Sequence, residues 1–247
     1  MTDVILLPGI IAPASFRYAA LLEHLPKDVN AVPKDLEVYA HASPPAAYSI
    51  ETEVQGIDAA ADKAGLERFH IYAHSGGGAC ALAYVAAHPD RVISLAVDEP
   101  ASDFSEEDQN DPYQDEIKAA AKLPEPEGTQ TFLRLQVAEG VEIPKPLTER
   151  TPDWMASRPA GIRAFAEAMY AYRVPPSAYE GYPGPVLFTY GSLSHPRWIA
   201  MRDRLARQFP DFTSVEFEGI HHLNTSHQAE PARTATLLTD FWREADS

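Results

Sequence analysis

The eight residues from His70 to Gly77 (HIYAHSGG) constrain this chain more than any other segment. Strand-forming residues lead into them, and a small, helix-compatible run follows from Ala79. Between the two, Ala73-His74-Ser75-Gly76-Gly77 allows a strand to reverse into a helix within a few residues, because residues with almost no side chain flank the serine. We therefore expect Ser75 on a tight, strained turn with its hydroxyl exposed, where it is a candidate nucleophile.

The small-x-Ser-x-small pattern at Ser75 resembles the nucleophile elbow of the α/β-hydrolase family. Ala73 stands where most members have glycine, and it is small enough to fit. The alternative is that Gly76, Gly77 and Gly78 form an ordinary glycine-rich connection or a phosphate cradle, with Ser75 as a helix cap. No lysine follows the glycines as in a P-loop, and no G-x-G-x-x-G is present, so the elbow is favoured.

Short apolar runs alternate with helical patterns, which predicts a mostly parallel sheet with helices on both faces, as the α/β-hydrolase fold requires. Besides the elbow strand, the expected strands are 4–7, 29–32, 92–97, 185–190 and 214–217. The expected helices include 16–25, 50–64, 114–123, 129–139, 160–173, 197–209 and one that begins at Pro231. Residues 101–182 are acidic and proline-rich, and we interpret them as an inserted helical cap in a core of residues 1–100 and 183–247.

A serine nucleophile needs a base, and two adjacent histidines follow the last predicted strand in Gly219-Ile220-His221-His222. The family resemblance places the base in a G-x-H pattern, which indicates His221. The Ser226-His227 pair supports the same choice, because several relatives have Ser-His six residues past the base. His222 is the alternative base.

The acid departs from the usual family pattern. Most relatives carry Gly-x-x-Asp after the strand at 185–190, but Gly191 is followed here by Ser194 at the aspartate position, and a neutral hydroxyl cannot stabilise an imidazolium as a carboxylate does. Glu99 ends the strand after the nucleophile helix, an arrangement that resembles haloalkane dehalogenases with a glutamate acid and fungal zearalenone lactonases. Asp98 is the neighbour to exclude, since adjacent strand residues point to opposite faces. The expected triad is Ser75, Glu99 and His221.

Two backbone N–H groups should bind the oxyanion of an acyl-transfer intermediate. The N–H of Gly76 directly follows the nucleophile at a helix N-terminus. The family resemblance indicates Ile10 as the second donor, because the residue after the glycine of Pro8-Gly9 has this role in relatives. Pro8 replaces the histidine that usually pins this loop, which leaves the loop geometry open.

Aromatic residues in the predicted cap are candidates for substrate binding: Trp154, Phe132 and Tyr170, with Met169 nearby. Such residues also form the small core of any helical cap, and this alternative applies to each of them. The chain has 20 Lys and Arg against 36 Asp and Glu, a net charge of -16, which disfavours nucleic acid and repels anionic ligands at long range. We therefore expect a neutral, hydrophobic small-molecule ester or lactone as the substrate.

The remaining expectations concern the location of the protein, its cofactors and its partners. The single cysteine, Cys80, suits a reducing compartment, and the start of the chain lacks a basic region and a long apolar run, so a cytoplasmic protein without a signal peptide or membrane partner is expected. No cofactor is expected, and His221, His222, His227 and Glu230 lack the spacing of a metal site. The sequence is compatible with a homodimer.

Three functions are compatible with these residues. The first is a serine carboxylic-ester hydrolase, an esterase or lactonase, that works through an acyl-enzyme on Ser75. The second is a lyase, C–C hydrolase or cofactor-free oxygenase that uses the His221 and Glu99 dyad while Ser75 only binds substrate. The third is a ligand receptor that retains the pocket without turnover.

Overall fold

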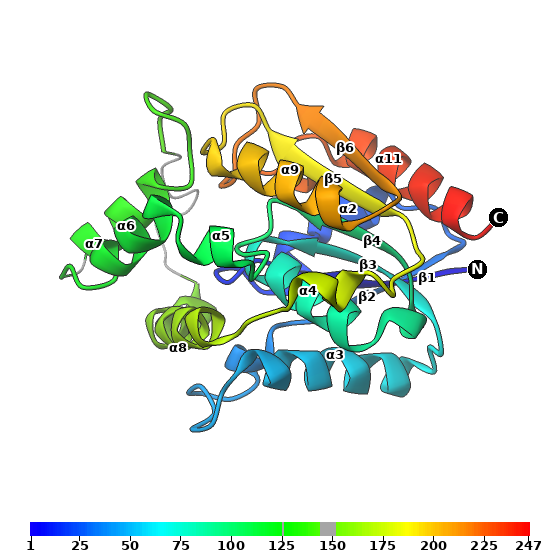
Figure 1. Cartoon of the computed structure of the whole chain (residues 1–247), viewed down its shortest axis with the longest axis horizontal. Helices are drawn as coiled ribbons and strands as arrows, with labels where there is room; N and C mark the ends of the chain where they lie inside the picture. Colours follow the sequence, from blue (N-terminus) through cyan, green and yellow to red (C-terminus); the bar gives the residue numbers. More distant parts are fainter. Residues whose placement is uncertain (125, 144–151) are drawn as a thin grey trace.

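Six parallel strands form one sheet in the order β2-β1-β3-β4-β5-β6 in a computed structural model that describes residues 1–124, 126–143 and 152–247 (Figure 1). The strands are β1 (Thr2–Leu7), β2 (Val29–Pro33), β3 (Phe69–His74), β4 (Val92–Asp98), β5 (Val186–Gly191) and β6 (Phe212–Phe217). Every strand expected from the sequence is present. The all-parallel pairing follows from the helical connections between successive strands.

The helices of the core are α1 (Ala14–Arg17), α2 (Ala19–His24), α3 (Ile50–Ala64), α4 (Ser75–Ala87), α9 (Arg197–Gln208), α10 (Ser226–Ala229) and α11 (Pro231–Ala245). Between β4 and β5 lie α5 (Glu106–Gln109), α6 (Pro112–Ala120), α7 (Glu127–Arg134) and α8 (Arg158–Ala171). Short 3-10 turns occur at Glu37–Tyr39, Pro89–Arg91, Asp153–Ser157 and Pro176–Tyr179. The helix expected over 16–25 is divided at Tyr18, whereas α3 ends as predicted at Gly65, where φ is +73°.

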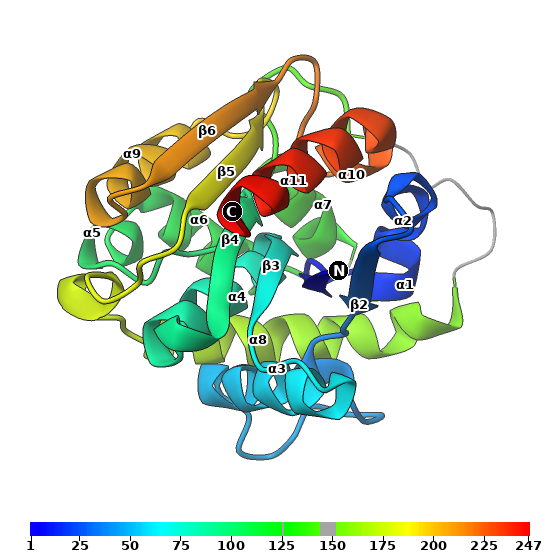
Figure 2. The same cartoon turned by 90° about the vertical axis from the view of Figure 1, so that its right-hand side faces the viewer.

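Alternate residues of β1 point to opposite faces of the sheet and so enter two separate cores. Ile5 and Leu7 pack with residues of α3, α4 and α9, and Val4 and Leu6 pack with residues of α2 and α11. Figure 2 shows these two helical layers on either side of the sheet. Residues 75–85 of α4 are all buried, because this helix lies between the sheet and its neighbours.

The helices α5 to α8 gather at the end of the molecule opposite the two termini (Figure 1). The strands run from the terminal end toward these helices, so the helices lie beyond the carboxyl ends of the strands. Ligands of open parallel sheets bind at this edge, so a ligand-binding site is expected here. In the described parts of the chain, no helix has the length and apolar character needed to cross a membrane.

Candidate active site

Ser75 lies on the tight turn that its neighbours predict. β3 ends at His74, α4 begins at Ser75, and Ser75 has φ of +51°, a region that residues with a Cβ rarely occupy. A Cβ added to Gly77 would come within 2.5 Å of the carbonyl oxygen of Pro8, and one added to Gly78 within 2.8 Å of Pro100 Cβ. The glycines after the serine are therefore needed because the neighbouring loops approach the backbone closely.

A chain of hydrogen bonds connects the hydroxyl of Ser75 to a carboxylate. Ser75 Oγ lies 3.0 Å from His222 Nε2, and His222 Nδ1 lies 2.8 Å from Glu99 Oε2. The other carboxylate oxygen of Glu99 accepts a bond of 2.7 Å from the N–H of Gly191. The contact with Glu99 assigns the proton to Nδ1, which leaves Nε2 free to accept a proton from Ser75. Glu99 thus lies where the sequence analysis expects the acid.

His221 does not take part in this chain, and its selection as the base is wrong on the geometry. Its ring points along the turn after β6, where Nδ1 accepts the N–H groups of Leu223 and Asn224, both at 3.2 Å. The turn directs the next side chain, His222, inward, where 5% of its surface is exposed. The Ser226-His227 spacing favoured His221 as the base, but His227 belongs to a different cluster and does not indicate which histidine contacts Ser75.

The loop expected to complete an oxyanion hole packs directly on the elbow. The N–H of Gly77 donates to the carbonyl of Pro8 at 3.0 Å, and a Cβ on Gly9 would be 3.2 Å from Ser75 Cβ. The hydroxyl of Tyr39 holds the next carbonyl, that of Ile10, at 2.7 Å. Gly76 is in the first turn of α4, where a backbone N–H has no acceptor within the helix. Ile10 and Gly76 both line the cavity that reaches Ser75.

Comparison with known proteins agrees with this fold. A family model described as the alpha/beta hydrolase fold matches residues 4–122. A thermophilic esterase from Thermogutta terrifontis, whose structure has malate bound, is 16% identical, with a TM-score of 0.75 over 100% of this chain and 91% of the esterase. The chain has the α/β-hydrolase fold.

Other solved structures with the α/β-hydrolase fold differ in their chemistry. A 2-hydroxy-6-oxo-6-phenylhexa-2,4-dienoate hydrolase from Rhodococcus sp. strain RHA1 is 19% identical, with a TM-score of 0.72 over 98% of this chain and 90% of that one. A non-heme bromoperoxidase from Mycobacterium tuberculosis H37Rv is 15% identical, with a TM-score of 0.72 over 100% and 94%. The sequence matches none of the curated proteins significantly. At these identities the likeness shows the fold alone.

Burial is the main cause of the pKa shifts of His222 and Glu99. Burial and, to a smaller extent, the Arg17 guanidinium lower the pKa of His222 to about 3, so the ring is neutral at rest and able to accept a proton. Burial also raises the pKa of Glu99 well above its usual range, and the charge of Asp98 adds to this effect, while the N–H of Gly191 opposes it. The indole of Trp198 stacks on His222 with centroids 4.3 Å apart and planes 11° apart, which excludes water from one side of the ring.

Asp98 lies in a separate buried cluster, as the alternation along β4 predicts. Its carboxylate is 3.2 Å from His227 Nδ1 and 3.4 Å from the hydroxyls of Tyr72 and Ser226. His74 connects the two clusters, since its ring lies 4.7 Å from that of His222 and 5.3 Å from that of His227. The cluster supports the turn that carries His222 without contacting Ser75.

A cavity of about 200 Å³ opens above Ser75 between the sheet edge and the helices that follow β4. Its lining is mainly apolar and includes Ile10, Ile162, Phe165, Met169 and Trp198. Phe165 of α8 lies directly over the elbow, because a Cβ on Gly76 would be 3.2 Å from its ring. The cavity can therefore hold an apolar ligand against the serine.

The candidates for substrate binding have different positions. Phe132 and Met169 line the cavity, whereas Trp154 and Tyr170 are not among the described residues that line it. Trp154 contacts Phe16, with centroids 5.9 Å apart, and Tyr170 lies under the ammonium of Lys118 at 4.7 Å. Both rings are partly buried, and Tyr170 packs against the main hydrophobic core. The sequence carries no local signal that distinguishes these cases.

Trp198, Phe165 and the arginines of the cavity lining are functional candidates that the sequence alone does not indicate. Trp198 follows Pro196 at the start of α9, and its Nε1 donates to the carbonyl of Pro100 at 3.1 Å. This long-range contact and packing in the main core hold its ring against His222. In the described ranges, no group of three or more His, Cys, Asp or Glu side chains is arranged to hold a metal ion.

Proposed function

We propose that the protein is a serine hydrolase that cleaves a carboxylic ester or lactone of a small molecule with an apolar body. The observation that carries this proposal is the continuous set of hydrogen bonds from Ser75 through His222 to Glu99, at the floor of the cavity. A hydroxyl, a neutral imidazole and a carboxylate in this order are the groups that acyl transfer requires. The apolar lining supports an apolar substrate.

The geometry supports a two-step reaction. His222 Nε2 accepts the proton of Ser75 as Oγ attacks the carbonyl carbon, and Glu99 stabilises the imidazolium that forms. The N–H groups of Ile10 and Gly76 bind the oxyanion, and His222 returns the proton to the leaving alkoxide. A water molecule, activated by the same His222, then hydrolyses the acyl-enzyme and releases the acid.

We also propose that the segment between β4 and β5, residues 101–182, acts as a cap. Its helix α8 supplies Phe165 over Gly76, and α7 supplies Phe132 to the same cavity. A cap in this position selects substrates by shape and keeps water away from the acyl-enzyme.

The first test is labelling with a fluorophosphonate probe, followed by intact-mass spectrometry. We expect one adduct on the wild-type protein and none on Ser75→Ala, because only an activated serine reacts with the probe. Turnover of p-nitrophenyl butyrate should fall by at least about 10³-fold in Ser75→Ala. Normal ester turnover by Ser75→Ala would contradict the acyl-enzyme and favour chemistry by the His222 and Glu99 dyad.

A further inference from the structure

The charged side chains among the described residues that line the cavity above Ser75 are opposite in sign to the net charge of the chain. The chain has a net charge of -16, yet no aspartate or glutamate occurs among the described residues that line the cavity. Three arginines line it instead: Arg158, Arg163 and Arg197. The expectation of a neutral substrate rests on the net charge, whereas binding depends on the charges within the site.

Arg197 and Arg163 have their charges compensated by protein or solvent. Arg197 forms a buried ion pair of 2.7 Å with Asp108 and donates to the carbonyl of Ala101 at 3.1 Å. Arg163 is exposed on α8, so water hydrates its guanidinium. Neither guanidinium needs a ligand to neutralise its charge, although the Nε atom of Arg197 is buried without a hydrogen-bond partner among the described residues.

Arg158 differs from both. Only 5% of its surface is exposed, its Nε atom is buried without a hydrogen-bond partner, and no carboxylate in the described part of the chain pairs with it. Its guanidinium lies 3.7 Å from the ring centroid of Tyr39 and 5.1 Å from that of Trp154, and the Tyr39 hydroxyl lies within its reach, so its described neighbours on this side are uncharged aromatic side chains. A buried cation without an anion is costly, and such groups normally have a partner.

The helix α8 relates Arg158 to the reacting serine. Arg158, Ile162, Phe165 and Met169 occur at helical spacing on one face and all line the cavity. Phe165 covers Gly76, and seven residues of helix separate it from Arg158, which is roughly 10 Å along the axis. Apolar side chains line the space between the two.

We propose that Arg158 binds a carboxylate of the substrate, and that the substrate is an ester or lactone with an apolar chain and a carboxylate roughly 10 Å from the bond that is cleaved. The planar guanidinium matches a carboxylate in two parallel hydrogen bonds. This inference rests on the proposed hydrolase function and names its substrate class.

The test compares the kcat/KM values of two series of substrates in the wild-type enzyme and in variants. The anionic substrates are monomethyl esters of aliphatic dicarboxylic acids of increasing length, and the neutral ones are methyl esters of monocarboxylic acids of matched length. We expect the ratio of their kcat/KM values, anionic over neutral, to fall about 10- to 100-fold in Arg158→Met. Arg158→Lys, which keeps the charge but not the planar fork, should retain part of the preference.

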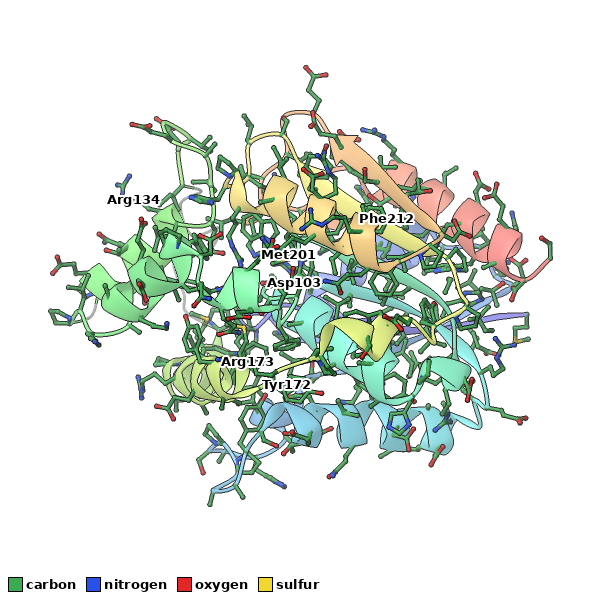
Figure 3. All side chains as sticks on the ribbon, in the orientation of Figure 1. Asp103, Arg134, Tyr172, Arg173, Met201 and Phe212 are labelled. Atoms are coloured by element: carbon green, nitrogen blue, oxygen red, sulfur yellow. The ribbon has the colours of Figure 1, made fainter. Side chains whose placement is uncertain are left out.

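Arg134→Met is the matched control. Arg134 is exposed at the end of α7 and projects away from the molecule (Figure 3). Because Arg134→Met removes the same charge from the same segment as Arg158→Met does, the ratio of kcat/KM values in Arg134→Met should equal that of the wild type. An unchanged ratio in Arg158→Met, or an equal fall in both variants, would overturn the carboxylate site.

A binding measurement separates this inference from the proposed hydrolysis. Monomethyl octanedioate should raise the melting temperature of Ser75→Ala but not that of the double variant Ser75→Ala/Arg158→Met. If the wild type cleaves no ester and Ser75 is not labelled, while this shift is observed, the hydrolase proposal fails and the carboxylate site stands. If esters are cleaved without any preference for the anionic form and no shift occurs, the carboxylate site fails and the hydrolase stands.

Discussion

At the scale of single residues, the composition of the candidate site depends on which of two adjacent histidines faces inward. His222 contacts both Ser75 and Glu99, whereas the ring of His221 bonds to the backbone of its own turn. We expect His222→Ala to lower kcat for p-nitrophenyl butyrate by at least about 10³-fold, because the general base is lost. His221→Ala should stay within about threefold of wild type. The opposite ranking would show that the base is His221.

At the scale of secondary-structure elements, buried ion pairs join α5 and its leading loop to α9. Asp108 pairs with Arg197 at 2.7 Å and with Arg204 at 3.0 Å, and Asp103 pairs with Arg204 at 2.7 Å. Asp103 lies where α5 meets α9 in Figure 3. These pairs connect the segment between β4 and β5 to the core, next to Trp198 of the active site.

Removing one carboxylate tests this connection. Asp108→Asn leaves the buried Arg197 without its ion-pair partner, and we expect a loss of about 3–5 kcal/mol in the free energy of unfolding, measured by urea denaturation. Glu107→Gln is the control, because Glu107 and Arg207 form an exposed pair of 3.3 Å, and it should change the free energy by less than about 1 kcal/mol. Equal effects of the two variants would contradict a stabilising role for the buried network.

At the scale of the whole molecule, the chemistry depends on the burial of His222 by distant parts of the chain. Trp198 of α9 covers one face of the ring, and His74 at the end of β3 lies 4.7 Å away from it. Burial lowers the pKa of His222 below its usual 6.5, so the neutral, active form persists as the pH falls through that value.

The pH profile of kcat/KM measures this effect. With a neutral ester as substrate, we expect the acid limb to have its midpoint below pH 6.5, because kcat/KM reports the free enzyme. Trp198→Ala should move the midpoint upward, toward 6.5, since it admits water to the ring. A wild-type midpoint at or above 6.5, or a shift to lower pH in Trp198→Ala, would contradict desolvation as the cause.

Local sequence determined the strands, the elbow and the position of Glu99. A strand such as Val4–Leu7, the Gly65 stop of α3 and the turn at Ser75 follow from residue size, apolar pattern and backbone freedom within a few positions. Glu99 was found because it ends a strand beside the elbow, where parallel strands bring their carboxyl ends together.

Only the tertiary structure decided which histidine contacts Ser75 and Glu99, which aromatics line the cavity and which arginine has no carboxylate partner among the described residues. His222, Trp198 and Arg158 are directed by contacts with residues far away in the sequence, such as Glu99, Pro100 and Tyr39. Burial and side-chain direction in a loop are set by the elements that pack around it, and no pattern of neighbouring residues encodes them.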